Sequence, residues 1–288
     1  MYEKINLEKK QYEFRIKLGI FITLFAFVMF LPVMTSIGFG GVFIIVPPFF
    51  GGFLFAAYNR SKIEKMSQAF KDQFLEEELK KIIPNSTYKM YDGFLEKEVV
   101  RSGLLRNEDR FHSEDMIVGD ISGVSFKCSD IHQQDVKKTD KGTRTTTVFR
   151  GRFYEFDFPK RFKSNVIIQQ RPLFDLFRGY NAVDMESVEF NSELQVYADN
   201  EHDAFYVLTP HFMERILLLD RKYNDKISFS IQNEKLFVAI NSGIDYFDFK
   251  LNQPINEDIF VEYKNEFEDM VEFVELLKLN ETIFKSLE

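Results

Sequence analysis

The chain has few of the residues and motifs by which catalytic proteins are recognised. One cysteine in 288 residues excludes an intrachain disulfide framework and fits a reducing compartment. The sequence contains no H-E-x-x-H, no paired C-x-x-C and no Asp-rich calcium loop, so no metal and no cofactor are expected. The nucleotide patterns G-x-x-x-x-G-K-[ST] and G-x-G-x-x-G and the hydrolase pattern G-x-S-x-G are also absent.

Two groups of residues carry metal-ligating atoms without a recognised spacing. They are His112, Glu114 and Asp115 in the first group, and Cys128, Asp130, His132 and Asp135 in the second. Alternate residues of the second group would face one way on a strand, which keeps a metal site open as an alternative. We favour solvated turn residues, because a metal site needs several ligands that converge on one point.

Charge is missing from one long stretch, Leu18 to Tyr58. As a single helix it would be roughly 60 Å long, about twice the thickness of a bilayer's hydrocarbon core. Pro32 and the glycines of segment 38–41 divide it, and a second apolar segment begins at Val42. Because neither segment has the polar face of a soluble helix, the sequence predicts a transmembrane helical hairpin over residues 18–58.

Cations flank this hairpin and are absent from its turn. They are Lys4, Lys9, Lys10, Arg15 and Lys17 before the first apolar segment, and Arg60, Lys62 and Lys65 after the second. By the positive-inside rule, we expect a multi-pass membrane protein with both termini cytoplasmic. Residues 1–17 are then a basic cytoplasmic N-terminus. A cleaved signal peptide is the alternative, but no A-x-A pattern follows the first segment.

The second apolar segment leads into an amphipathic one. Gly52 and Ala56 form a small-xxx-small pair that supports close helix packing. Beyond them apolar residues recur near helical spacing until Pro84, which predicts a stalk helix over residues 59–84. A dimerising coiled coil is the alternative for this helix.

From Met116 onward the hydrophobic period becomes that of strands. The segments rich in Val, Ile, Phe, Tyr and Thr are MIVGD, GVSFKCS, TTTVFRGRFYEFDF, NVIIQQ, LQVYA, AFYVLT, KISFSIQ, KLFVAI and DYFDF. Hairpins are expected in SIQNEKLFV and AINSGIDYF, with turns at 233–235 and 241–243. One helix should begin with Thr209 as N-cap, and another should cover roughly Glu257 to Leu279.

These elements predict an α+β fold. Two N-terminal transmembrane helices and a stalk helix precede a cytoplasmic antiparallel-sheet domain at residues 85–288, which a C-terminal helix closes. Three segments in order are SEDMIVGDISGVSFKCSDI, VFRGRFYEFDFPKRF and VEFNSELQVYADNEHDAFYVLTPHFMERILLL. Together they resemble the bacterial membrane-anchored family called domain of unknown function 3137. The resemblance implies two N-terminal apolar spans and a location in the bacterial inner (plasma) membrane, and it brings no activity.

Positive charge is concentrated between Lys137 and Arg178. This segment has eleven cations and four anions, a net charge of +7 in a chain whose net charge is −8. We predict contact with anionic lipid headgroups or another anionic partner through Lys137, Lys138, Lys141, Arg144, Lys160, Arg161 and Lys163. The alternative is a polar hairpin tip and strands whose cations pair with acidic neighbours. Nucleic acid is not expected, because the pI is about 5.3 and no recognition motif is visible.

One cluster offers groups for acid–base chemistry. Its residues are Asp199, Glu201, His202, Asp203, His211 and Glu214. Such groups serve catalysis when burial moves their pKa values, whereas a charged loop and a helix start have the same sequence pattern. The predicted function is a membrane-anchored cytoplasmic binding or regulatory scaffold whose partners are the lipid bilayer and an anionic headgroup or a protein. A membrane-bound hydrolase using this cluster is the alternative.

Overall fold

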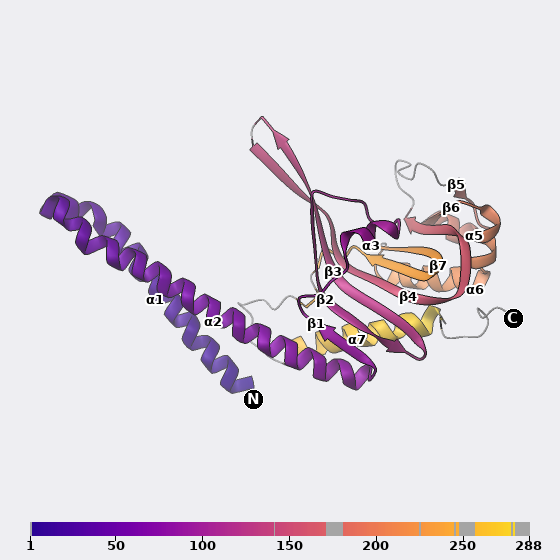
Figure 1. The fold of residues 1–288 in the computed structure, drawn as a ribbon, viewed down its shortest axis with the longest axis horizontal. Coiled ribbons are helices and arrows are strands. Elements are labelled where there is room, and N and C mark those ends of the chain that lie inside the picture. The colour runs from indigo at the N-terminus through magenta and orange to yellow at the C-terminus, as the bar shows by residue number, and fades with distance from the viewer. Residues whose placement is uncertain are drawn as a thin grey trace. The chain divides into compact units, whose positions relative to one another are not determined.

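The structure is a computed structural model that describes residues 2–140, 142–170, 181–224, 226–244, 246–247, 257–277 and 279 (Figure 1). The chain forms two compact units. One is helical and contains Met1–Phe74, and the larger one contains Leu75–Asp248.

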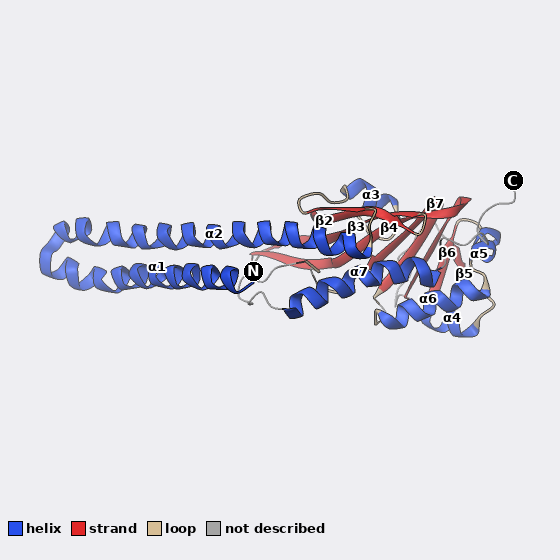
Figure 2. Cartoon of the chain, turned by 90° about the horizontal axis from the view of Figure 1, so that it is seen from below, coloured by secondary structure: helices blue, strands red, loops and turns tan. Residues whose placement is uncertain are grey.

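The first unit is an antiparallel pair of helices (Figure 2). α1 covers Tyr2–Ile37, the 3-10 turn η1 covers Gly38–Gly41, and α2 covers Val42–Ile82. Gly38 has a φ of 67°, a value that favours glycine, so the predicted glycine turn is where the chain reverses. α2 continues past Tyr58 without a break. The expected second span and the expected stalk are therefore one helix.

Small residues bring the two helices into close contact. A Cβ added at Gly19 would lie 2.7 Å from the carbonyl oxygen of Gly52 and 2.9 Å from the Cβ of Ala56. Thr23 Oγ1 on α1 donates to the carbonyl oxygen of Phe49 on α2 at 3.4 Å. The small-xxx-small pair therefore lies in the helix contact, as its spacing predicted.

The outward surface of this pair is apolar. Twenty large hydrophobic side chains between Leu18 and Tyr58 are exposed, with Phe39 and Phe43 more than 80% exposed. The stretch Asn6–Met66 is long and apolar enough to be one candidate membrane span, and only 6% of its most apolar window is buried. The most apolar part of the chain thus faces outward.

The second unit is built on a seven-stranded antiparallel sheet. Its order is β1-β2-β3-β4-β6-β5, and β7 pairs with β4. The strands are β1 Ser86–Lys89, β2 Arg110–Ile121, β3 Val124–Thr139, β4 Gly142–Gln170, β5 Asn181–Val183, β6 Leu194–Ala198 and β7 Ile227–Ile240. Ser122 and Gly123 join β2 to β3 with φ of 54° and 85°, as a type I′ hairpin turn requires.

β4 bends around a hairpin that β7 forms (Figure 1). The amide of Asn241 donates to the carbonyl oxygen of Lys226 at 2.9 Å, so the two ends of β7 lie side by side. Asn233 makes the turn between them with a φ of 54°. The first half of β4 pairs with residues 235–240 and its second half with residues 229–231. The hairpin predicted at 233–235 is confirmed, and NVIIQQ is the second half of β4.

Helices cover both faces of the sheet. On one face, α7 (Glu257–Leu277) packs Phe273 against Tyr154 of β4, with ring centroids 5.3 Å apart. On the other, α3 (Glu96–Arg101) places Val99 in an apolar cluster with Phe153 of β4. Successive residues of β4 therefore enter different layers, which explains why the neighbouring residues Phe153 and Tyr154 are both aromatic and both buried.

Three short helices lie near β5 and β6. They are α4 Val188–Glu193, α5 Glu201–Val207 and α6 Pro210–Lys222. α6 begins as predicted, because Thr209 Oγ1 accepts a hydrogen bond from the amide of Phe212 at 3.3 Å. The predicted C-terminal helix is α7.

One predicted strand is wrong, and a second is absent at the two of its residues that the structure describes. AFYVLT lies largely in the helix α5, because Asn200 Oδ1 accepts from the amide of His202 and caps a helix there. In DYFDF, Tyr246 and Phe247 form a turn, so the second expected hairpin does not form at these two residues. Asp245 and the segment 248–256 lie outside the described residues.

Candidate functional site

β3 and β4 continue past the neighbouring strands as a two-stranded arm, residues 135–139 and 142–146 (Figure 1). β2 ends at Arg110, opposite Gln134, so beyond this point β3 pairs with β4 alone. The described side chains from Lys137 to Val148 are exposed. A two-stranded ribbon of this kind has no layer packed on it and offers both faces to a partner.

Lys137 and Arg144 lie directly opposite each other in the arm. Like charges in this position repel. Lys137 Nζ lies 2.9 Å from Asp135 Oδ2, and this hydrogen bond raises the pKa of Lys137 while Arg144 lowers it. Lys138 and Arg144 form no ion pair with any residue that the structure describes. Two cations of the arm are thus available to an anionic partner.

Lys141 and the side chains of Lys160, Arg161 and Lys163 lie outside the described residues. The backbone of 160–163 belongs to the bend of β4, where Phe162 pairs with Asn233. This bend and the arm are at opposite ends of the first half of β4 (Figure 1).

Arg152, from the same basic segment, is fully buried. Its Nε donates to Asp130 Oδ1 at 2.8 Å, and its guanidinium carbon lies 4.3 Å from the ring centroid of Phe247. Asp130 Oδ2 also accepts from the amide of Tyr246 at 3.0 Å. The Arg152–Asp130 pair therefore holds the turn at 246–247 against the sheet. Arg152 pairs with an acidic neighbour, which is the alternative to a lipid contact that the sequence left open for the basic segment.

Residues considered for metal binding contact other side chains instead of a common point. Cys128 is fully buried with its sulfur 3.9 Å from that of Met270, and burial raises the pKa of its thiol to about 12. His132 Nε2 lies 3.3 Å from Thr147 Oγ1, and His112 lies 3.4 Å from Glu114. Within the described ranges, no group of three or more His, Cys, Asp or Glu is placed to hold a metal ion.

The six residues considered for hydrolysis lie at two helix starts. Asp199 Oδ2 accepts from the amide of Asn165 at 3.1 Å, and Glu201, His202 and Asp203 form the first turn of α5. His211 Nδ1 lies 3.6 Å from Glu214 Oε2 on α6, and these two side chains are 85% and 71% exposed. For His211 and Glu214 this is the predicted helix start, whereas Glu201, His202 and Asp203 begin a helix where a charged loop before a strand was expected.

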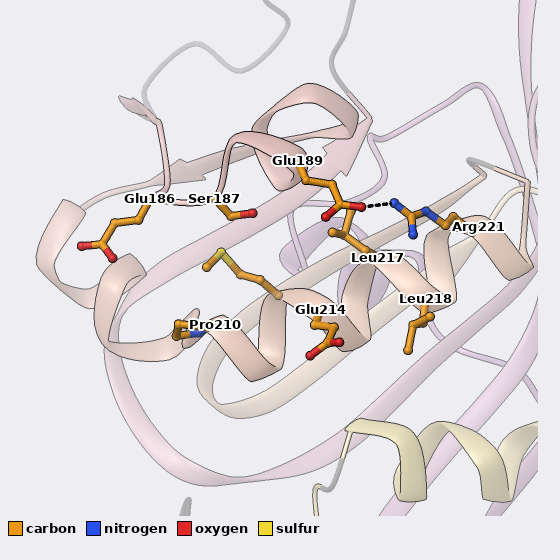
Figure 3. A pocket seen from close by; sticks show the side chains of 9 residues that line it. Glu186, Ser187, Glu189, Pro210, Glu214, Leu217, Leu218 and Arg221 are labelled. Atoms are coloured by element: carbon orange, nitrogen blue, oxygen red, sulfur yellow. Dashed lines mark hydrogen bonds and ion pairs between the residues drawn. The ribbon is translucent and has the colours of Figure 1, made fainter.

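A groove of about 460 Å³ lies between α4 and α6 (Figure 3). Its lining residues are Glu186, Ser187, Glu189, Pro210, Met213, Glu214, Leu217, Leu218 and Arg221. Met213 and Leu217 are buried, whereas Leu218 is 48% exposed. Arg221 Nη2 donates to Glu189 Oε1 at 2.7 Å and to Glu193 Oε1 at 2.8 Å, and so links the two helices.

Apart from Glu214, none of these lining residues was predicted as a site residue. α4 was not expected, although Ser187 followed by Glu189 is a helix-start signal: the Ser187 hydroxyl accepts from the amide of Phe190. A second signal was the run ILLL at 216–219. It is apolar around more of the helix than one buried stripe requires.

The fold and these surfaces define a class: an α+β sheet unit preceded by an apolar helical hairpin. Residues 147–279 match the model of the family described as "Protein of unknown function (DUF3137)". The resemblance predicted from the sequence is confirmed, although the segment SEDMIVGDISGVSFKCSDI precedes the matched range.

Comparison with curated proteins gives no match. Among solved structures, the crystal structure of the mycobacterial trehalose monomycolate transport factor A, TtfA, is similar with a TM-score of 0.39 and 11% identity. The match covers 70% of this chain and 95% of that one.

Proposed function

We propose that the chain is a membrane-anchored binding module of the bacterial inner membrane. The α1–α2 hairpin crosses the bilayer twice and holds the α+β unit on the cytoplasmic side. The observation that carries this proposal is the twenty exposed large apolar side chains between Leu18 and Tyr58, where no residue is charged. Soluble monomers rarely expose apolar surface on this scale, because each Å² costs about 25 cal/mol in water.

The inside of the hairpin supports the same proposal. Helices in a bilayer associate through small residues rather than through apolar burial, and Gly19, Thr23 and Gly52 form this contact. Cations before Leu18 and after Tyr58, with none in η1, favour a cytoplasmic position for both ends.

The arm is the binding element in this proposal, and anionic lipid headgroups are its partner. Its five residues on each strand reach about 17 Å beyond the sheet. The rest of the chain is acidic and repels an anionic surface, but charges are screened beyond about 8 Å at physiological salt. The arm therefore presents Lys138 and Arg144 beyond the range of that repulsion, where each gains about 1 kcal/mol near headgroups.

Thiol labelling tests the anchoring and the orientation. Cys128 is fully buried and should not react with the reagent, so any labelling comes from the single introduced cysteine. Gly40→Cys lies in η1, where an added Cβ meets only Ile37 at 3.8 Å, and Glu234→Cys lies at the exposed β7 turn. In intact spheroplasts, an impermeant thiol reagent should label Gly40→Cys and should label Glu234→Cys only after lysis.

Two results would contradict the proposal. Labelling of Glu234→Cys in intact spheroplasts would reverse the orientation. Recovery of the chain in the aqueous fraction after carbonate extraction without detergent would remove the membrane anchor itself.

A further inference from the structure

The groove between α4 and α6 has an apolar floor on one helix face. Along α6, residues 210, 213, 214, 217, 218 and 221 follow helical spacing, so they form one stripe that faces the groove (Figure 3). Leu218 is the exposed leucine of this stripe, whereas Met213 and Leu217 are buried. Leu218 therefore offers a ligand an apolar anchoring contact on α6, while the α4 side contributes the polar residues Glu186, Ser187 and Glu189.

The rim of the groove is acidic. Three lining residues are glutamates and one is an arginine, and Arg221 is already engaged by Glu189 and Glu193. Glu186 forms no ion pair with a described residue, and Glu214 has the exposed His211 at 3.6 Å as its partner. Cations at the rim of the groove would therefore gain one carboxylate each, from Glu186 and from Glu214, without displacing an existing arginine pair.

The geometry points to this groove as a docking site for a basic amphipathic segment of a partner protein. An apolar side chain of that segment would contact Leu218, and its lysines or arginines would face Glu186 and Glu214. The volume suits two or three anchoring side chains rather than a whole domain. Anionic lipid and nucleic acid are disfavoured by the same carboxylates. This inference does not depend on the membrane anchor or on the arm.

Site-directed disulfide exchange on the full-length chain in neutral nanodiscs tests this site. Leu218→Cys and Leu95→Cys are matched, because the two leucines are 48% and 56% exposed and Cys128 is buried. The probe is a Leu/Lys amphipathic peptide of about 12 residues that carries one activated cysteine. It should react with Leu218→Cys about tenfold faster than with Leu95→Cys, and a Leu/Glu peptide should show no such preference.

Charge variants separate docking from general attraction to an acidic protein. Glu186→Gln with Glu214→Gln should abolish the preference for Leu218→Cys. Glu234→Gln with Glu275→Gln removes the same charge at two other exposed positions and should leave the preference intact. Isosteric changes at exposed sites keep the fold, which circular dichroism verifies.

Three outcomes would overturn the inference. Equal rates at Leu218→Cys and Leu95→Cys would show that the groove does not select the peptide. A preference that survives Glu186→Gln with Glu214→Gln would exclude the carboxylates as its cause. Rapid disulfide dimers of Leu218→Cys without peptide would identify a second copy of the chain as the occupant.

Discussion

Gly19 of α1 lies against Gly52 of α2, and the space beside each Cα atom holds a hydrogen atom but no side chain. A Cβ added at Gly52 would lie 2.8 Å from the carbonyl oxygen of Gly19, and the reverse distance is 2.7 Å. The helix backbones touch here, so the contact depends on the absence of both side chains.

Leucine at Gly19 or Gly52 should separate the helices, because overpacking a tight contact costs about 1–3 kcal/mol. Double electron–electron resonance between spin labels at the exposed positions Phe14 and Tyr58 should give a broader distance distribution in either variant. Gly51→Leu is the matched control, since an added Cβ there meets nothing within 4 Å. An unchanged distribution in Gly52→Leu would contradict this account of the contact.

Arg152→Met should destabilise the α+β unit by about 3–5 kcal/mol, because it leaves the buried carboxylate of Asp130 without its cation. Adding Asp130→Leu should recover most of the loss, since a well-packed apolar pair often replaces a buried ion pair without penalty. Urea unfolding followed by circular dichroism measures both, and the chain has no tryptophan to report instead. A double variant as unstable as Arg152→Met would show that the pair is needed for more than charge balance.

Burial raises the pKa of Glu266 on α7 to about 7, although Arg152 acts in the opposite direction. Between pH 4.5 and 7 the folded chain therefore binds more protons at this site than the unfolded chain, so stability from this group is lost as pH rises. Glu266→Gln should raise the free energy of unfolding by about 1–3 kcal/mol at pH 8 and leave it nearly unchanged at pH 4.5.

The exposed Glu275→Gln is the control for this pH effect and should give no gain at pH 8. Thermal unfolding of both variants at pH 4.5 and pH 8 measures whether the stability gain of Glu266→Gln is larger at the higher pH. A larger gain for Glu266→Gln at pH 4.5 than at pH 8 would exclude a raised pKa as the cause.

Charge reversal in the arm tests the lipid proposal. Full-length chain in neutral nanodiscs should co-sediment with heavy vesicles that contain phosphatidylglycerol, and Lys138→Glu should reduce the bound fraction several-fold. Lys97→Glu changes an exposed lysine on α3 and should have little effect. High salt should abolish binding, because surface electrostatics are screened. Equal binding to vesicles of pure phosphatidylcholine would count against headgroup recognition.

Local signals in the sequence predicted several elements well. The charge-free run and its glycines located the helical hairpin and its turn, since no tertiary contact is needed to read them. Thr209 before Pro210 located the start of α6, and Asn233 located a hairpin turn. Each signal acts within a few residues.

Long-range pairing was not predictable in the same way. Nothing within NVIIQQ reveals that it continues β4 after a bend, because its partners lie about 30 residues later in β6 and about 60 residues later in β7. At α5, one capping bond from Asn200 outweighed the strand propensity of AFYVLT. The groove also went unpredicted, since it depends on contact between α4 and α6, which 16 residues of sequence separate.

The way β4 encloses β7 also bears on how the chain matures during translation. Residues 152–168 leave the ribosome about 70 residues before the hairpin that fills the space between their two halves, a delay of several seconds at roughly 5–20 residues per second. During that interval, the edges of both halves of β4 that later pair with β7 have no strand beside them. A nascent chain of this topology is therefore most vulnerable to aggregation just before residue 240 emerges.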